Sequence, residues 1–182
     1  IRDRYHLLKY YIEHYRMQKY KPNAGYVQFL FNDMCPQTFY GIYDYWGLPK
    51  KGLQAVLESN MPVGIFLKFK DKLDAIYAVN DYSCALGICR VGYSITDETG
   101  KVVAEDAKDI NIKEDSLTKL WEFDGTIHSG SVYNVALWIE QDGKLLAQNG
   151  YHDVFYMPQH TPGHPTYMSP VSYTHLRAHE TS

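Results

Sequence analysis

The residues best placed to do chemistry are Asn32 and Asp33, which directly follow a run of apolar residues, Tyr26–Phe31. Such a run is typical of a strand buried on both faces, as in a parallel sheet. Side chains at the carboxyl end of a barrel strand project into the mouth of an active site, so this pair can contact a ligand there. Phe29 can form part of the floor of that mouth. The alternative is that Asp33 caps the following turn and Asn32 bonds to the backbone, as Asx residues commonly do.

The elements that would position this pair follow the order helix, strand, loop, helix. Over residues 5–19 apolar side chains recur at the spacing of an amphipathic helix. Pro49 opens a second, short helix. This order is typical of an α/β barrel, and 26–31 would be its last strand. The apolar side of the second helix is expected to carry Leu53, Val56 and Leu57.

From residue 61 onward the hydrophobic period changes to two. In Ile88–Ile95 every second side chain is apolar, which is typical of a strand with one buried face. Gln141-Asp142-Gly143 contains the Asp-Gly pair that favours a type I′ hairpin turn. Short strands with no helix between them predict an immunoglobulin-like β-sandwich. The candidate strands are Val63–Phe69, Ala75–Val79, Ile88–Ile95, Lys101–Ala104, Ile110–Ile112, Lys119–Phe123, Val132–Glu140 and Leu145–Gln148.

The predicted fold class is therefore mixed: the last strand and helices of a (β/α)8 barrel, followed by an all-β immunoglobulin-like sandwich. The barrel end covers residues 5–58 and the sandwich 59–157, and a proline-rich tail occupies 158–182. Residues 1–4 and 171–181 resemble translated sequencing-adaptor sequence, so we expect both ends to be non-native and the chain to be a gene fragment.

Composition limits the classes of function. The 182 residues carry 18 Lys+Arg and 21 Asp+Glu, a net charge of −3, which excludes a broad nucleic-acid surface driven by charge. The longest apolar run is far shorter than the ~20 residues of a membrane span, so no membrane span is expected.

The cysteines Cys35, Cys84 and Cys89 are predicted to be reduced thiols, although Cys84 and Cys89 could close a small loop if the protein is exported. No cofactor is expected, because His160, His164 and His175 match no standard metal-ligand spacing.

Short motifs around the Asn-Asp pair resemble a known family. Phe29-Leu30-Phe31-Asn32-Asp33-x-x-Pro36, followed by Asp44-Tyr45-x-Gly47 and Pro49-Lys50, resembles the end of the barrel in glycoside hydrolase family 2, especially its β-mannosidase-like branch. That family has an aromatic-rich eighth strand, Asn-Asp-x-Trp-Pro, Asp-Tyr-x-Gly, and a lysine near the start of the next helix. Here Phe29 stands at the position of the family's strand tryptophan, and Cys35 at that of the motif tryptophan.

The resemblance implies part of a retaining, exo-acting glycoside hydrolase that acts on a carbohydrate. Such enzymes use two carboxyl groups, and in this family both are glutamates on earlier barrel strands. No catalytic residue is therefore assigned in this chain, which we expect to be inactive alone and to pack against the barrel of its parent chain. The resemblance leaves Phe29, Asn32 and Asp33 as substrate-binding candidates, and Glu13, Glu58 and Glu140 are expected at the solvated surface.

A second class of function stays open: a non-catalytic carbohydrate-binding or adhesion module whose tyrosines stack on glycan rings. Residues 26–58 favour the enzyme fragment, because a free-standing module has no need of a buried parallel strand with flanking helices. The sequence leaves the sugar, the linkage, the oligomeric state and the compartment open.

Overall fold

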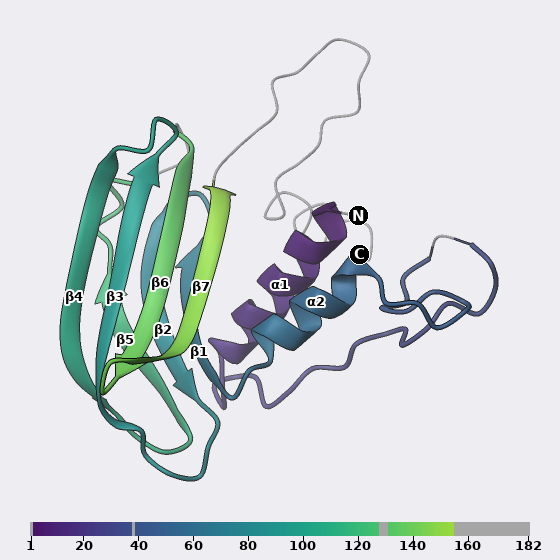
Figure 1. The fold of residues 1–182 in the computed structure, drawn as a ribbon, viewed down its shortest axis with the longest axis horizontal. Coiled ribbons are helices and arrows are strands. Elements are labelled where there is room, and N and C mark those ends of the chain that lie inside the picture. Colours follow the sequence, from purple (N-terminus) through teal and green to yellow (C-terminus); the bar gives the residue numbers. More distant parts are fainter. Residues whose placement is uncertain (1, 38, 128–130, 155–182) are drawn as a thin grey trace. The chain divides into compact units, whose positions relative to one another are not determined.

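The computed structural model describes residues 2–37, 39–127 and 131–154. The chain divides into two compact units, Ile1–Met61 and Pro62–Ser182, which we call the helical unit and the sandwich unit (Figure 1). The tail predicted over 158–182, with its three histidines and the adaptor-like residues 171–181, lies outside the described residues. In the part of the chain that is described, no helix has the length and apolar character needed to cross a membrane.

The helical unit contains both predicted helices, α1 (Arg2–Arg16) and α2 (Lys51–Ser59), which pack against each other. Small residues of α2, namely Gly52, Ala55 and Ser59, form its buried side. A Cβ at Gly52 would lie 2.9 Å from Leu8 Cδ1, so a larger residue here would require the Leu8 side chain to move. Of the three residues expected on the apolar side of α2, Leu53 and Val56 are half-buried and Leu57 is 61% exposed, so the small residues rather than these form the most buried side.

Two polar residues of α1 are buried, contrary to the expectation that the glutamates are solvated. Glu13 is 2% exposed, and its Oε1 lies 2.5 Å from Lys9 Nζ, one helical turn away. Their opposite charges compensate each other, which is the condition for burying such groups. Between the two helices, Tyr5 of α1 donates a hydrogen bond to Glu58 Oε2 of α2 at 2.5 Å, and burial raises the pKa of Tyr5.

The buried barrel strand predicted over Tyr26–Phe31 is wrong. The segment has no regular secondary structure, and Val27 and Phe29 are 93% and 75% exposed. A strand buried on both faces needs partners on both edges, whereas all seven strands that the structure describes belong to the sandwich unit. The described part of the helical unit therefore shows two helices and a loop region, and no barrel strand.

The sandwich unit consists of two antiparallel sheets, with strand orders β1-β2-β5 and β4-β3-β6-β7, as predicted for a β-sandwich (Figure 1). The segments predicted over Lys101–Ala104 and Ile110–Ile112 form one strand, because the charged stretch between them pairs with β3 along an exposed sheet edge. The strands are β1 (Val63–Phe69), β2 (Leu73–Asn80), β3 (Gly87–Asp97), β4 (Val102–Ile112), β5 (Ser116–Glu122), β6 (Tyr133–Gln141) and β7 (Lys144–Val154).

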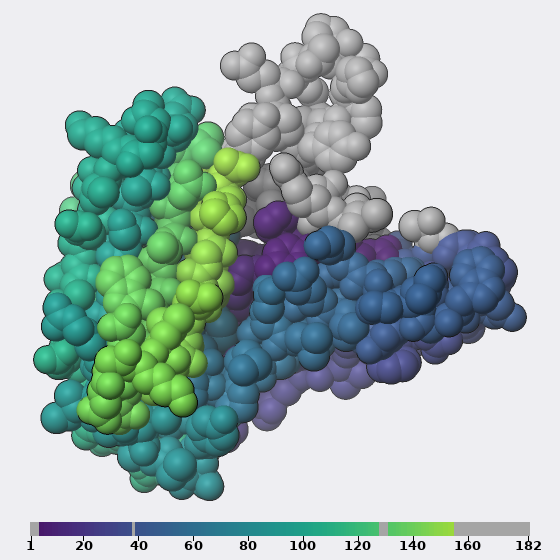
Figure 2. Space-filling view, viewed as in Figure 1, coloured from purple at the N-terminus to yellow at the C-terminus, as the bar shows by residue number. Residues whose placement is uncertain are grey.

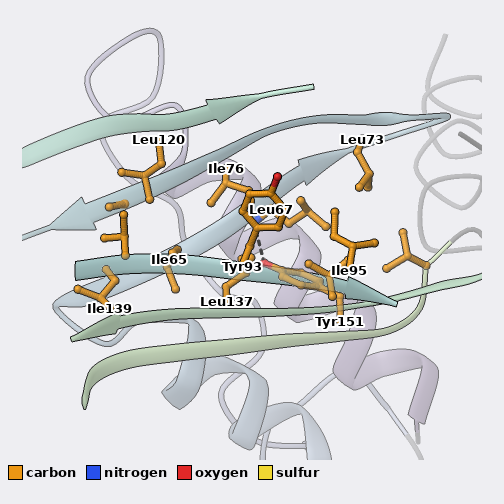
Figure 3. Close-up of a cluster of buried hydrophobic side chains, with 14 of the residues drawn as sticks. Ile65, Leu67, Leu73, Ile76, Tyr93, Ile95, Leu120, Leu137, Ile139 and Tyr151 are labelled. Atoms are coloured by element: carbon orange, nitrogen blue, oxygen red, sulfur yellow. Dashed lines mark hydrogen bonds between the residues drawn. The ribbon is translucent and has the colours of Figure 1, made fainter. Parts of the chain in front are cut away.

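Alternating apolar side chains from both sheets meet in one core (Figure 3). Polar groups join the sheets at one edge: Leu67 N donates to Tyr151 Oη at 3.0 Å, and Asn149 Nδ2 donates to Ile65 O at 2.9 Å. The β6–β7 turn is confirmed, since Asp142 and Gly143 have φ of 51° and 76°, the positive values that a type I′ turn requires.

Candidate functional site

The loop region between α1 and α2 holds the predicted site residues, and backbone hydrogen bonds bring three of its segments together. Ile42 N and Tyr43 N both donate to Phe31 O at 3.0 Å. Asp33 N donates to Tyr43 O at 3.1 Å, and Lys50 N donates to Ile42 O at 2.9 Å. Residues 31–33, 42–44 and 48–50 therefore form a small bonded cluster that fixes the position of Asp33.

The Asp33 carboxylate is completely buried and is held by two donors. Its Oδ1 accepts a hydrogen bond from Gly41 N at 2.9 Å, and its Oδ2 forms an ion pair with Lys50 Nζ. The Lys50 ammonium also donates to Phe39 O at 3.2 Å. The hydrogen bond from Lys50, with a smaller contribution from the Gly41 amide, holds the pKa of Asp33 below its usual value. Asp33 is therefore an ionised carboxylate that joins its own segment of the loop region to Gly41 and Lys50.

Two further residues complete this arrangement. A Cβ at Gly41 would lie 2.6 Å from both Asp33 Oδ1 and Tyr43 O, so the close approach of the backbone to the carboxylate requires glycine. Arg4 donates to Phe39 O and lies 5.4 Å from the centre of the Tyr40 ring. Arg4, one of the adaptor-like residues 1–4, lies within α1 and contacts this loop.

The other two predicted site residues lie at the surface. Asn32 is exposed and donates from Nδ2 to Asp33 O at 3.2 Å, and the Phe29 ring is also exposed. Nearby in sequence, Asp44 Oδ1 accepts hydrogen bonds from Trp46 N at 2.9 Å and Leu48 N at 2.8 Å, which presents an exposed Trp46 ring. The structure thus places the Asp33 side chain inside the loop cluster, with Asn32 and Phe29 available at its surface.

This geometry suits ligand positioning better than bond cleavage. Asp33 is ionised and bonded through both oxygens, so it is neither a proton donor nor an accessible nucleophile. These bonds differ from the local turn cap of the alternative interpretation, because Gly41 lies eight residues and Lys50 seventeen residues beyond Asp33. The described residues contain no group of three side chains suited to hold a metal ion, and Cys35, Cys84 and Cys89 are free thiols.

Sequence reasoning missed Lys50 and Gly41 as partners of Asp33. The signal for Lys50 was present, because the motifs that carry the family resemblance contain both the Asn-Asp pair and the Pro49-Lys50 step. The sequence gave no signal for Gly41, because every residue except proline has a backbone amide and residue type does not show which amide acts as the donor.

Solved glycosidases share this fold. The β-D-mannosidase of Dictyoglomus thermophilum has a TM-score of 0.68 and 24% identity, over 80% of this chain and 18% of that chain. The exo-chitosanase of Amycolatopsis orientalis in complex with PNP-β-D-glucosamine has a TM-score of 0.72 and 13% identity, over 95% of this chain and 22% of that chain. No protein-family model and no curated protein matches the sequence.

These likenesses show the fold. A share of 80% or more of this chain is larger than either unit, so the likeness includes residues of both the helical unit and the sandwich unit. The chain spans less than a quarter of the length of these two glycosidases.

Proposed function

We propose that this chain is the carboxyl-terminal part of an exo-acting, retaining glycoside hydrolase of family 2, of the β-mannosidase-like branch. The observation that carries the proposal is the fold likeness over both units, a pair of helices with a bonded loop followed by a β-sandwich, to a β-mannosidase and an exo-chitosanase. The motifs from Phe29 to Lys50 support the same family. The proposal therefore rests on the fold likeness and these motifs, and not on a buried barrel strand at 26–31, where the described chain has no regular secondary structure.

In this proposal the loop cluster forms part of the wall of a sugar pocket. Asn32 and Phe29 are exposed, so an amide and an aromatic ring can contact a sugar hydroxyl and a sugar face. Asp33 acts as a positioning residue, because its bonds to Gly41 and Lys50 hold the backbone from which Asn32 projects.

The exposed apolar residues of the helical unit indicate the partner. Scattered apolar residues at a surface are ordinary, but a concentration of large rings and aliphatic chains in one segment marks an interaction site. We assign the partner as the earlier part of the barrel in the parent chain, which would also carry both catalytic glutamates. The residues concerned are Val27, Phe29, Phe31, Met34, Tyr40, Tyr45, Trp46 and Leu48.

The first experiment recovers the parent gene upstream of Ile1 and compares the two proteins on aryl β-mannosides, β-galactosides and β-glucuronides. We expect the longer protein to hydrolyse at least one of these substrates and the 182-residue chain to hydrolyse none. An upstream sequence without two candidate glutamates, or turnover by the 182-residue chain, would contradict the proposal.

The second experiment tests the loop cluster in the active parent protein. Asp33→Ala should lower kcat/KM at least about tenfold, because the wall of the pocket loses its support. Lys50→Met should produce a loss of the same kind, since it removes the other half of the ion pair.

A matched control separates this effect from a general loss of stability. Asp97 accepts hydrogen bonds from Thr99 N and Lys101 N in a hairpin turn of the sandwich unit, so Asp97→Ala removes another hydrogen-bonded aspartate, one that lies outside the loop cluster. We expect kcat/KM of Asp97→Ala to equal that of the parent. If kcat/KM of Asp33→Ala equals that of the parent, the loop cluster is not part of the sugar-binding site.

A further inference from the structure

The outer face of the four-stranded sheet carries an aromatic platform. Trp138 on β6 stands directly opposite Gly92 on β3, so both point to the same face. A Cβ at Gly92 would lie 2.1, 2.4 and 2.9 Å from Cζ2, Cε2 and Cη2 of Trp138. Because three adjacent ring atoms lie at similar distances from this position, the face of the indole ring, rather than its edge, covers Gly92. This face of the sheet is seen in the left part of Figure 2, coloured teal to yellow-green.

The neighbouring row of residues on one side of the platform carries short side chains on three of its four strands. In register next to Gly92 and Trp138 are Ser94 on β3, Ala136 on β6 and Gly150 on β7, which pair with one another across the strands, and Glu105 on β4 pairs with Ser94 at the end of the row. These short side chains rise little above the backbone. Trp138 is half-buried, and among the described residues no aromatic ring and no cation stacks on it, so part of its ring is accessible to a ligand.

The row on the opposite side is charged. Arg90, opposite both Asp109 and Glu140, lies 3.5 Å from the Asp109 carboxylate, and all three border an open cavity of about 340 Å³ that Asp142 also lines. The lining thus holds three carboxylates and one guanidinium, so the rim is acidic overall. It offers hydrogen-bond acceptors to a polar ligand and disfavours an anionic one.

We propose that this face is a second carbohydrate-binding site, in which one pyranose ring stacks on Trp138 and the next ring of the same β-linked chain reaches the acidic rim. A flat indole with one accessible face matches the C–H face of a sugar ring, and the rim beside it matches hydroxyl or amino groups at the edge of a ring. The site does not depend on the proposed hydrolase function, because none of its residues belongs to the helical unit.

A simpler interpretation must be distinguished by experiment: Trp138 could serve only to shield the Gly92 backbone from water. Shielding of Gly92 requires only the Trp138 ring, whereas a carbohydrate-binding site also requires the acidic residues at the rim. The charge of the rim also makes a prediction that shielding does not, namely that ligand charge controls affinity.

The test uses the 182-residue chain labelled with 15N at its three tryptophans, with each indole signal assigned by substitution. The probes are three β-1,4-linked hexamers that differ in charge: mannose, which is neutral, glucosamine, which is cationic, and mannuronate, which is anionic. We expect the Trp138 indole signal to shift with the first two, with the glucosamine hexamer bound more tightly, and to stay unchanged with the mannuronate hexamer.

Substitutions then locate the binding. Trp138→Ala should weaken binding of the mannose hexamer at least about tenfold, whereas Trp138→Tyr keeps Gly92 covered and should retain measurable binding. Glu140→Gln should weaken binding of the glucosamine hexamer while that of the mannose hexamer stays the same. Tyr82→Ala, which removes an exposed aromatic ring elsewhere in the sandwich unit, should change neither.

Two results would overturn the proposal. One is an unchanged Trp138 signal with both the mannose and the glucosamine hexamers. The other is unchanged affinity in Trp138→Ala. A shift of the Trp46 signal alone would place sugar binding in the helical unit, which overturns the second site while supporting the proposed function of the loop cluster.

Discussion

The two units use apolar residues in opposite ways. In the sandwich unit, alternating side chains such as Ile95 and Ile139 are fully buried, because each strand has a partner sheet facing it. In the helical unit, the equally apolar residues Val27 and Phe29 are exposed. In an alternating segment the sequence itself specifies which face of the strand is buried. A continuous apolar run is buried only when neighbours cover both of its faces.

The largest effect expected from this comparison is a difference in autonomous folding. Residues 60–157 expressed alone should show one cooperative thermal transition, because the two sheets supply the whole core (Figure 3). Residues 1–61 expressed alone should show none, and the amides of 27–31 should exchange rapidly with solvent. A cooperative transition in residues 1–61, or its absence in residues 60–157, would break the comparison.

A second prediction compares single side chains in the 182-residue chain. Ile95→Ala should lower the free energy of unfolding by about 2–5 kcal/mol, because it leaves a cavity in the sandwich core. Phe29→Ala removes a larger side chain but should change the stability of the 182-residue chain by less than about 0.5 kcal/mol, since the ring is exposed. Chemical denaturation monitored by circular dichroism measures both. A larger loss for Phe29→Ala would show that the ring is buried in solution.

The same difference explains how far the sequence predicted the fold. Val63–Phe69 was predicted with the bounds that the structure shows, and the Asp142-Gly143 turn was predicted with its type, because alternation and turn chemistry are local properties. The strand predicted over Tyr26–Phe31 failed because its burial depends on neighbours that its own residues do not specify.

The candidate site shows a similar limit. The sequence singled out Asp33 as a site residue but did not predict that its carboxylate is buried. This burial depends on a backbone amide at Gly41 and on an ammonium seventeen residues away at Lys50. Likewise, the sequence predicted a strand over Val132–Glu140 but gave no reason to expect Trp138 to lie across Gly92, which depends on the register between β3 and β6.

A third prediction tests the contact between Trp138 and Gly92. Gly92→Ala would place a methyl group 2.1 Å from the indole, so the ring must move, and we expect a loss of about 1–3 kcal/mol in the free energy of unfolding. Gly25→Ala is the matched control in the helical unit, because nothing lies within 4 Å of the added Cβ. If Gly92→Ala is as stable as Gly25→Ala, the indole does not lie on Gly92.

The smallest expected effect concerns the pKa values of two carboxylates, one from each unit. The ion pair with Lys50 lowers the pKa of Asp33, and hydrogen bonds from Thr99, with smaller contributions from the Lys101 amide, lower that of Asp97. A lowered pKa in the folded state means that each carboxylate stabilises the protein above its usual pKa. This stabilisation is lost as the pH falls through the lowered value.

The two carboxylates should respond differently to Lys50→Met, because only Asp33 depends on a distant side chain. Titration of the side-chain 13C signals should give midpoints below the usual aspartate pKa of about 3.9 for both residues in the unsubstituted chain. In Lys50→Met the midpoint of Asp33 should rise while that of Asp97 stays unchanged, since the turn supplies its own donors from residues two and four positions ahead. An Asp33 midpoint that does not respond to Lys50→Met would mean that the loop cluster is held by its backbone bonds alone. In that case the motif lysine would have to be assigned another role.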